Sequence, residues 1–128
     1  MDNKASPQFL PGANVISIVN HPPEIHPGTP VKIVKPWIGS LCAVQLPDGM
    51  IHRWFASFEL KPQNGSLTTG SFAQVTNSTG HGSPPHVAAG TIVRIVKCIP
   101  KTIFYDVTLS NGEYHRWLAE FELAVPMV

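Results

Sequence analysis

The chain has 128 residues, of which 43% are hydrophobic and 13% charged, and its net charge is +1. This length allows one ordinary domain or two very small ones. The near-zero charge excludes the broad basic surface that polyphosphate binding requires, and the small number of charges favours a surface that meets itself or a partner.

The first twelve residues are expected to form a flexible tail, because Pro7, Pro11 and Gly12 interrupt any regular pattern. We find no signal-peptide pattern and no apolar run long enough to span a membrane, so we expect a cytoplasmic location. Cys42 and Cys98 are too few for a disulfide framework and form no C-x-x-C pair. We therefore expect free thiols.

Most of the remaining chain is written twice. GTPVKIVK (28–35) matches GTIVRIVK (90–97) at six of eight positions, and GMIHRWFASFEL (49–60) matches GEYHRWLAEFEL (112–123) at eight of twelve. Upstream, NVISIVN and SFAQVTN match more weakly at equivalent places.

The repeat predicts the domain organisation. We expect a first domain at residues 13–62, a linker at 63–70 and a second domain at 71–128, each folded from its own copy. Residues matched between the copies should then overlay in two similar structures.

Each copy is predicted to be β, because short runs of Val, Ile and aromatic residues lie between Gly, Pro and Asn. No long segment has helical periodicity. Alternation places Val31 and Ile33 inward and Lys32 outward. A second buried face is expected from Cys42, Val44 and Leu46 in the first copy and from Tyr105, Val107 and Leu109 in the second.

The turn at Pro47-Asp48-Gly49 leaves two registers open. A three-residue loop pairs Leu46 with Met50 and turns His52 and Trp54 toward the core, with Arg53 outward. A two-residue Asp-Gly loop reverses every face. The proline favours the first register, and a single 3₁₀ turn should follow each His-Arg-Trp.

The segments GTIVRIV and YDVTLSNGEYHRWLAEFEL resemble the small barrels of the SH3-like superfamily, closest in style to its Tudor-like and KOW-like branches. This resemblance implies an all-β fold of two tandem SH3-like small β-barrels related by an internal repeat. A Tudor-like barrel also implies an aromatic cage for a methylated cation, with walls drawn from Trp37, Trp54, Phe104, Tyr105 and Trp117.

Two considerations select the candidate binding residues. Arg53 and Glu59, like Arg116 and Glu122, recur together and suit either a structural ion pair or a ligand clamp. Residues that keep the fold should match between copies, so the unmatched Trp37, Phe104 and Tyr105 are predicted at an inter-barrel or partner surface. The full candidate set is Trp37, Arg53, Trp54, Phe104, Tyr105, Arg116 and Trp117.

The six histidines offer a weaker alternative, a transition-metal site drawn from His21, His26, His52, His81, His86 and His115. We expect no cofactor, and no catalytic motif is present. The sequence therefore favours a non-catalytic binding or scaffold module for a protein or peptide partner, including a second copy of itself. The alternative function is nucleic-acid binding through the scattered Lys and Arg residues.

Overall fold

The protein is described by a computed structural model that covers residues 6–21, 25–81 and 87–126. Strands dominate this part of the chain, so the all-β prediction is confirmed. The elements are β1 (Asn14–Ser17), β2 (Pro30–Gln45), β3 (Ile51–Ala56), η1 (Ser57–Glu59), β4 (Leu60–Pro62), β5 (Phe72–Val75), β6 (Ile92–Leu109), β7 (Tyr114–Ala119), η2 (Glu120–Glu122) and β8 (Leu123–Ala124). None of the described helices is long and apolar enough to cross a membrane.

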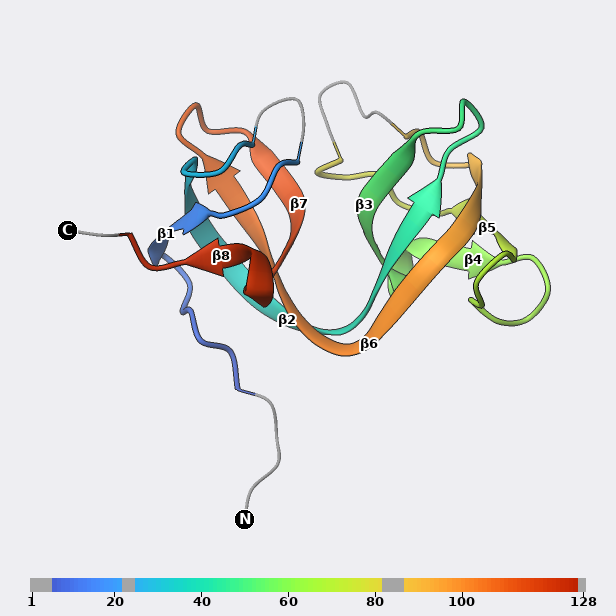
Figure 1. Ribbon diagram of the computed structural model, residues 1–128, viewed down its shortest axis with the longest axis horizontal. Coiled ribbons are helices and arrows are strands. Elements are labelled where there is room, and N and C mark those ends of the chain that lie inside the picture. The colour runs from blue at the N-terminus through green and yellow to red at the C-terminus, as the bar shows by residue number, and fades with distance from the viewer. Residues whose placement is uncertain (1–5, 22–24, 82–86, 127–128) are drawn as a thin grey trace, which may run out of the picture. The chain divides into compact units, whose positions relative to one another are not determined.

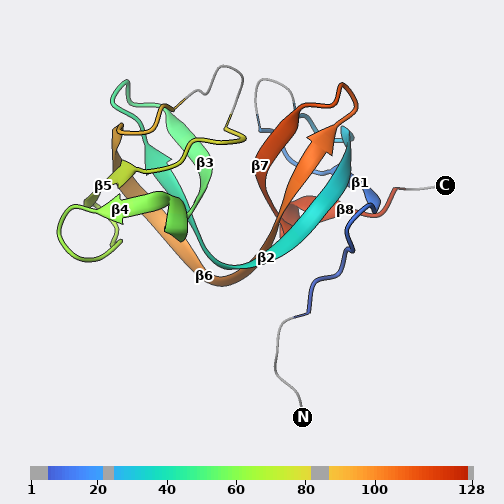
Figure 2. The same ribbon diagram turned by 180° about the vertical axis from the view of Figure 1, so that it is seen from behind.

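The strands form one antiparallel sheet with an open path. Its order is β4-β5-β6-β2-β1-β8, with β3 added to β2 and β7 added to β6. Figures 1 and 2 show β2 and β6 as the two long strands of the sheet. Because β4 and β8 end the path, the sheet is not closed among the described residues. The two tandem SH3-like barrels are therefore not shown by this sheet and stay a prediction.

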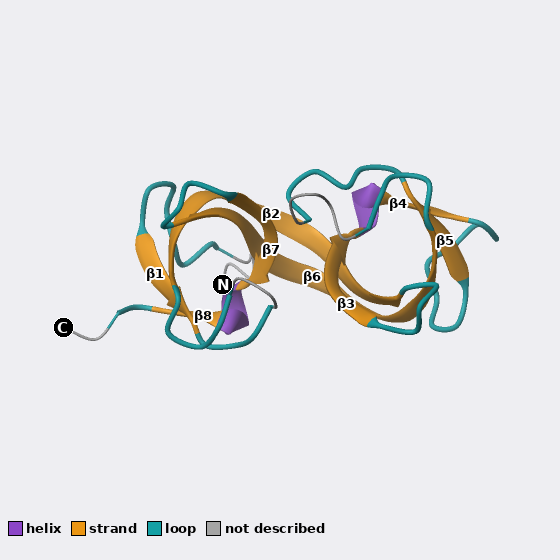
Figure 3. Cartoon of the chain, turned by 90° about the horizontal axis from the view of Figure 1, so that it is seen from above, coloured by secondary structure: helices purple, strands orange, loops and turns teal. Residues whose placement is uncertain are grey.

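The chain divides into two compact units that differ from the predicted domains. Unit 1 contains residues 1–38 and 103–128, and unit 2 contains residues 39–102. Each unit joins the first half of one sequence copy to the second half of the other, since β2 and β6 continue from one unit into the other instead of turning back. Figure 3 shows the strands of each unit curling around their own interior.

The two hydrophobic cores follow this exchange. The core of unit 1 combines Val31 and Ile33 of the first copy with Tyr105, Val107 and Leu109 of the second. The core of unit 2 conversely contains Cys42, Val44, Val93 and Ile95. The predicted inward faces are confirmed, but their assignment to separate copies is wrong. Both copies carry the same pattern, so the pattern cannot tell which copy a half-strand will join.

The hairpin prediction is confirmed in both copies. The N–H of Leu46 donates to the carbonyl of Met50 at 2.8 Å, and the N–H of Gly49 donates back to Leu46 at 2.9 Å. Gly49 has φ +91°, a value that glycine adopts at little cost. Leu109, Gly112 and Glu113 repeat this arrangement, so the three-residue loop is the register present.

A bulge then alters the faces of the His-Arg-Trp segment. Val44 pairs with His52, but Cys42 pairs with Phe55, so β3 carries one extra residue. Trp54 and Phe55 are consequently both buried, Arg53 is exposed and His52 is half-buried. The peptide bonds Arg53–Trp54 and Arg116–Trp117 are cis. The predicted 3₁₀ turns, η1 and η2, follow directly.

The expectation of free thiols is wrong, because Cys42 and Cys98 form a disulfide with their Cα atoms 4.0 Å apart. The two residues are separated by 56 positions and come from different sequence copies. Their half-strands lie together only because unit 2 contains the second half of β2 and the first half of β6. Sequence spacing alone does not reveal this contact.

Candidate functional site

Alternating cationic and aromatic side chains form a stack in unit 1. The Nζ atom of Lys35 lies 4.1 Å from the ring centroid of Trp37. The guanidinium carbon of Arg116 lies 5.6 Å from the Trp37 centroid and 4.6 Å from that of Trp117. The two indole rings meet edge to face at 5.3 Å. We call Lys35, Trp37, Arg116 and Trp117 the cation–aromatic stack.

A buried carboxylate positions this stack. Asp106, on β6, accepts the backbone N–H of Lys35 at 3.1 Å and the hydroxyl of Tyr114. The hydroxyl of Tyr114 in turn accepts the Nε–H of Arg116 at 2.8 Å. Burial, with a further contribution from the hydrogen bond to Asp106, raises the pKa of Tyr114 above its ordinary value. The hydroxyl therefore keeps its proton at neutral pH and holds the guanidinium in place.

Unit 2 builds the same strand framework with different residues at the places of Trp37, Asp106 and Tyr114. The position of Trp37 aligns with Ile99, Asp106 with Ala43, and Tyr114 with Ile51. Arg53, which matches Arg116, lies 5.9 Å from the ring of Trp54. Since unit 2 folds with aliphatic residues at these places, folding alone does not require the stack in unit 1. Among the candidate residues, Trp37 is therefore the one for which a role other than folding has the clearest support.

Other predicted binding residues are buried. Trp54, Phe104 and Trp117 are at most 4% exposed, and Phe104 packs edge to face on Trp117 at 4.8 Å. Trp37 is half-buried and also carries Lys35 and Arg116 against its ring. These rings therefore do not form the open aromatic cage that the Tudor-like resemblance implies, and placing Phe104 on a binding surface is wrong.

Tyr105 is also a core residue and not a surface contact. It is fully buried, and its hydroxyl accepts the N–H of Phe9 at 3.2 Å and donates to Glu120 at 2.6 Å. Burial, followed by the bond to Glu120, raises the pKa of Tyr105 to about 12. The prediction that Tyr105 lies at a partner surface is wrong because its ring fills the core on the face shared with Val107.

The two glutamates of the repeat are held by histidines. The Nε2 atom of His21 lies 2.9 Å from Glu122, and that of His81 lies 3.1 Å from Glu59. The same carboxylates accept the backbone N–H groups that begin η2 and η1, at 2.9 and 3.0 Å. Each pair therefore ties a loop of one copy to the 3₁₀ turn of the other. The recurrence of histidines in both copies is visible in the sequence, but it does not predict that glutamates are their partners. The arginine–glutamate pairs stay a prediction.

The histidine metal site finds no support in the described residues. The Nδ1 atom of His81 faces Nε2 of His52 at 3.2 Å, so both ring nitrogens of His81 contact protein groups. His26 is exposed and lies 3.3 Å from the amide oxygen of Asn20. His86 falls outside the described residues. Within the described ranges, no three His, Cys, Asp or Glu side chains are arranged to hold a metal ion.

Comparison with known structures shows the fold. A crystal structure of ydhK from Bacillus subtilis, a DUF1541 family protein, superposes with a TM-score of 0.69 at 21% identity, covering 94% of this chain and 86% of that one. A second crystal structure of ydhK gives 0.64 at 21% identity over 90% and 98% of the two chains. The solution structure of the ydhK C-terminal domain gives 0.64 at 21% identity over 91% and 93%. No protein-family model and no curated protein matches the sequence.

Proposed function

We propose that this protein is a non-catalytic binding module that recognises an acidic segment of a partner protein through the cation–aromatic stack of unit 1. The observation that carries this proposal is the placement of Lys35 over Trp37, with Arg116 against the same ring. Lys35 is exposed and Trp37 is half-buried. An apolar ring with two cations close to it suits a segment that alternates carboxylates with apolar side chains.

The stack favours an anionic ligand over a cationic one. A methylated ammonium group approaching Trp37 would meet the positive charges of Lys35 and Arg116, which already lie near the ring. A nucleic acid is also anionic, but its many phosphates favour a protein with a clear basic excess. The net charge here is only +1. We therefore favour a protein segment that brings a few carboxylates.

The proposal contains no chemical step. The cysteines are joined in a disulfide, and His21 and His81 are buried against glutamates that also cap backbone N–H groups. These contacts give the side chains a structural role within each unit. Recognition of a partner by unit 1 is sufficient to explain why the stack is formed there.

Calorimetric titration with a synthetic Glu- and Asp-rich peptide that contains leucine and phenylalanine tests the proposal. We expect Lys35→Gln to weaken binding by about two- to fivefold, as for an exposed ion pair. Trp37→Ile, which installs the residue of unit 2, should weaken it by about tenfold or more. Lys97→Gln is the matched control, because Lys97 occupies the position of Lys35 in the other copy.

The titration has clear opposing outcomes. Wild-type affinity in both Lys35→Gln and Trp37→Ile would refute the role of the stack. Equal binding of a peptide whose acids are replaced by amides would refute the requirement for charge. Preferential binding of a mixed-sequence oligonucleotide, with a steep loss of affinity as salt rises, would establish the nucleic-acid alternative instead.

A further inference from the structure

Unit 2 carries a second surface that the cation–aromatic stack does not include. Two neighbouring clefts of about 460 and 260 Å³ share Gln45 and Arg94 in their walls. Leu46, Phe72 and Ile92 line the larger cleft, and Ile51 lines the smaller one. We call this double cleft and its apolar rim the Arg94 surface.

The rim of the Arg94 surface is unusually apolar for exposed positions. Phe72 is 50% exposed, Ile92 is 43% exposed and Ile51 is 48% exposed. Met50, in the adjoining hairpin, is 65% exposed. Single exposed hydrophobic residues are ordinary, but several gathered around clefts typically mark a contact site.

Unit 1 supplies an internal control for this surface. The backbone frames match, because Gly12 donates to Ile33 as Gly70 donates to Ile95, both at 2.8 Å. The strand registers then place Asn14 beside Lys32 where unit 2 has Phe72 beside Arg94. This match is shifted by one residue from the weak sequence alignment of the two segments.

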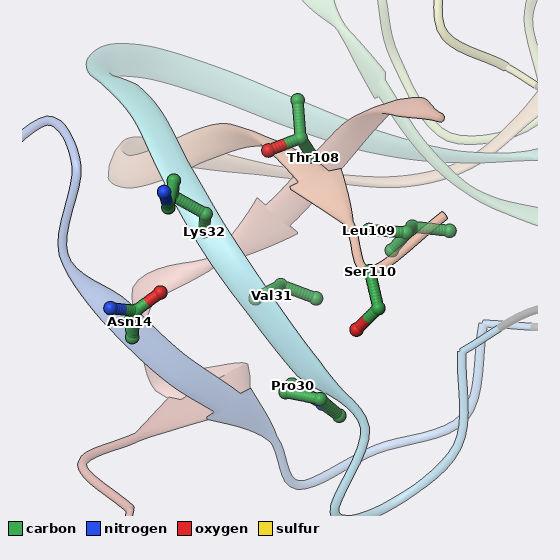
Figure 4. A pocket seen from close by; sticks show the side chains of 7 residues that line it. All are labelled: Asn14, Pro30, Val31, Lys32, Thr108, Leu109 and Ser110. Carbon is green, nitrogen blue, oxygen red and sulfur yellow. The ribbon is translucent and has the colours of Figure 1, made fainter. Parts of the chain in front are cut away.

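The equivalent cleft of unit 1 is more polar. It has a volume of about 250 Å³, and Figure 4 shows Asn14, Lys32, Thr108 and Ser110 around it together with Pro30, Val31 and Leu109. The counterparts of Met50 and Ile51 in this unit are Glu113 and Tyr114. The strand framework therefore forms with Asn14 and Glu113 where unit 2 has Phe72 and Met50, so folding does not explain these two exposed apolar residues.

Arg94 identifies the chemistry of the occupant. Its side chain is exposed, and among the described residues its guanidinium has no ion pair or hydrogen bond. One of its nitrogens lies close to the backbone of Gly70, since a Cβ built there would be 3.9 Å from it. In the part of the chain that the structure describes, the guanidinium thus has no carboxylate partner, and Arg94 lines the clefts together with apolar side chains.

We propose that the Arg94 surface binds an extended segment of a partner protein that inserts large apolar side chains into the double cleft and pairs one carboxylate with Arg94. Apolar contact would supply most of the affinity, and the two-pronged guanidinium would fix the register of the segment. This surface is distinct from the cation–aromatic stack, and it uses one charge where the stack uses two.

Selection from a random-peptide display library against the whole protein tests this proposal. We expect enriched peptides to combine aromatic or large aliphatic residues with an Asp or Glu. Their synthetic versions should bind Phe72→Asn and Arg94→Gln about tenfold to a hundredfold more weakly, the range expected for a lost charged hydrogen bond or a lost apolar anchor. Phe72→Asn installs the residue of unit 1, so loss of fold is not expected and is checked by circular dichroism.

Matched variants in unit 1 separate this proposal from the proposed function. Asn14→Ser and Lys32→Gln should leave the selected peptides bound, and Arg94→Gln should leave binding at the cation–aromatic stack unchanged. Absence of enrichment, enrichment without acidic residues, or equal binding to Arg94→Gln would overturn the inference. A wild-type dimer on size exclusion that becomes monomeric in Phe72→Asn would also overturn it, because the occupant would then be a second copy of this chain.

Discussion

Removal of the disulfide should destabilise unit 2 selectively. Cys42 and Cys98 close a loop of 56 residues, and the chain-entropy relation gives about 4 kcal/mol for a loop of this length. For a protein of this size, that loss corresponds to a fall of the melting temperature on the order of 15 °C. Cys42→Ala/Cys98→Ala should therefore unfold at markedly lower urea concentration than the oxidised wild type.

The location of the loss is as informative as its size. The disulfide joins two residues of unit 2, so hydrogen exchange should become faster in β3 and β5 before it changes in β7. Treatment of the wild type with a dithiol should reproduce the effect, while the double variant should not respond to it. A loss below about 1 kcal/mol, or equal acceleration in both units, would refute the reasoning about the loop.

The same bond tests the exchange of half-strands. Cys98 aligns with Pro36, so if each copy folded alone, Cys42 would lie near Pro36 and not near Cys98. Non-reducing peptide mapping of the oxidised protein should recover the Cys42 peptide linked to the Cys98 peptide within one chain. Recovery of both as free thiols under mild oxidation would contradict the division into units.

Three further outcomes are expected. The pKa of Tyr105 is raised to about 12 in the folded state from its ordinary 10, so its contribution to stability is complete below pH 10 and is lost as the pH rises toward 12. Urea titrations of Tyr105→Phe should lack this alkaline loss of stability. A pH profile identical to that of the wild type would refute the assignment. Glu59→Gln should destabilise unit 2 by about 1–3 kcal/mol, since Glu59 is buried and bonded to His81 and Ala56; faster exchange in unit 1 alone would contradict this. Trp117→Ala should cost about 3–5 kcal/mol in denaturant, as for a fully buried aromatic, and a loss under 1 kcal/mol would show that its ring has another role.

The local predictions were the most reliable. The hairpin register followed from Pro47-Asp48-Gly49, and the inward faces followed from alternation at Val31 and Ile33. The His-Arg-Trp segment was predicted less completely, because the extra residue in β3 interrupts alternation and buries Phe55 directly after Trp54. The apolar run from Trp54 to Ala56 also suits a regular strand that is buried on both faces, so the hydrophobic pattern alone does not identify the bulge.

The candidate site was predicted only in part. Trp37 and Arg116 were identified as binding candidates and do lie together, but Phe104 and Tyr105 are buried. These residues were selected because they differ between the two copies. A residue can differ because it lies on a binding surface or because it replaces another core residue, and the sequence does not tell these two cases apart. Tyr105 occupies the place in unit 1 that Cys42 occupies in unit 2.

By itself, the sequence determined the all-β class, the repeat, the tight turns and the buried faces, because turn residues and alternation act over a few neighbouring positions. Only the tertiary structure decided which half-strand joins which core, and with it the Cys42–Cys98 bond and the pairing of His21 with Glu122. Two similar copies offer each half-strand two similar partners. The choice between them depends on whether β2 and β6 turn back or continue, and that is a property of long-range packing.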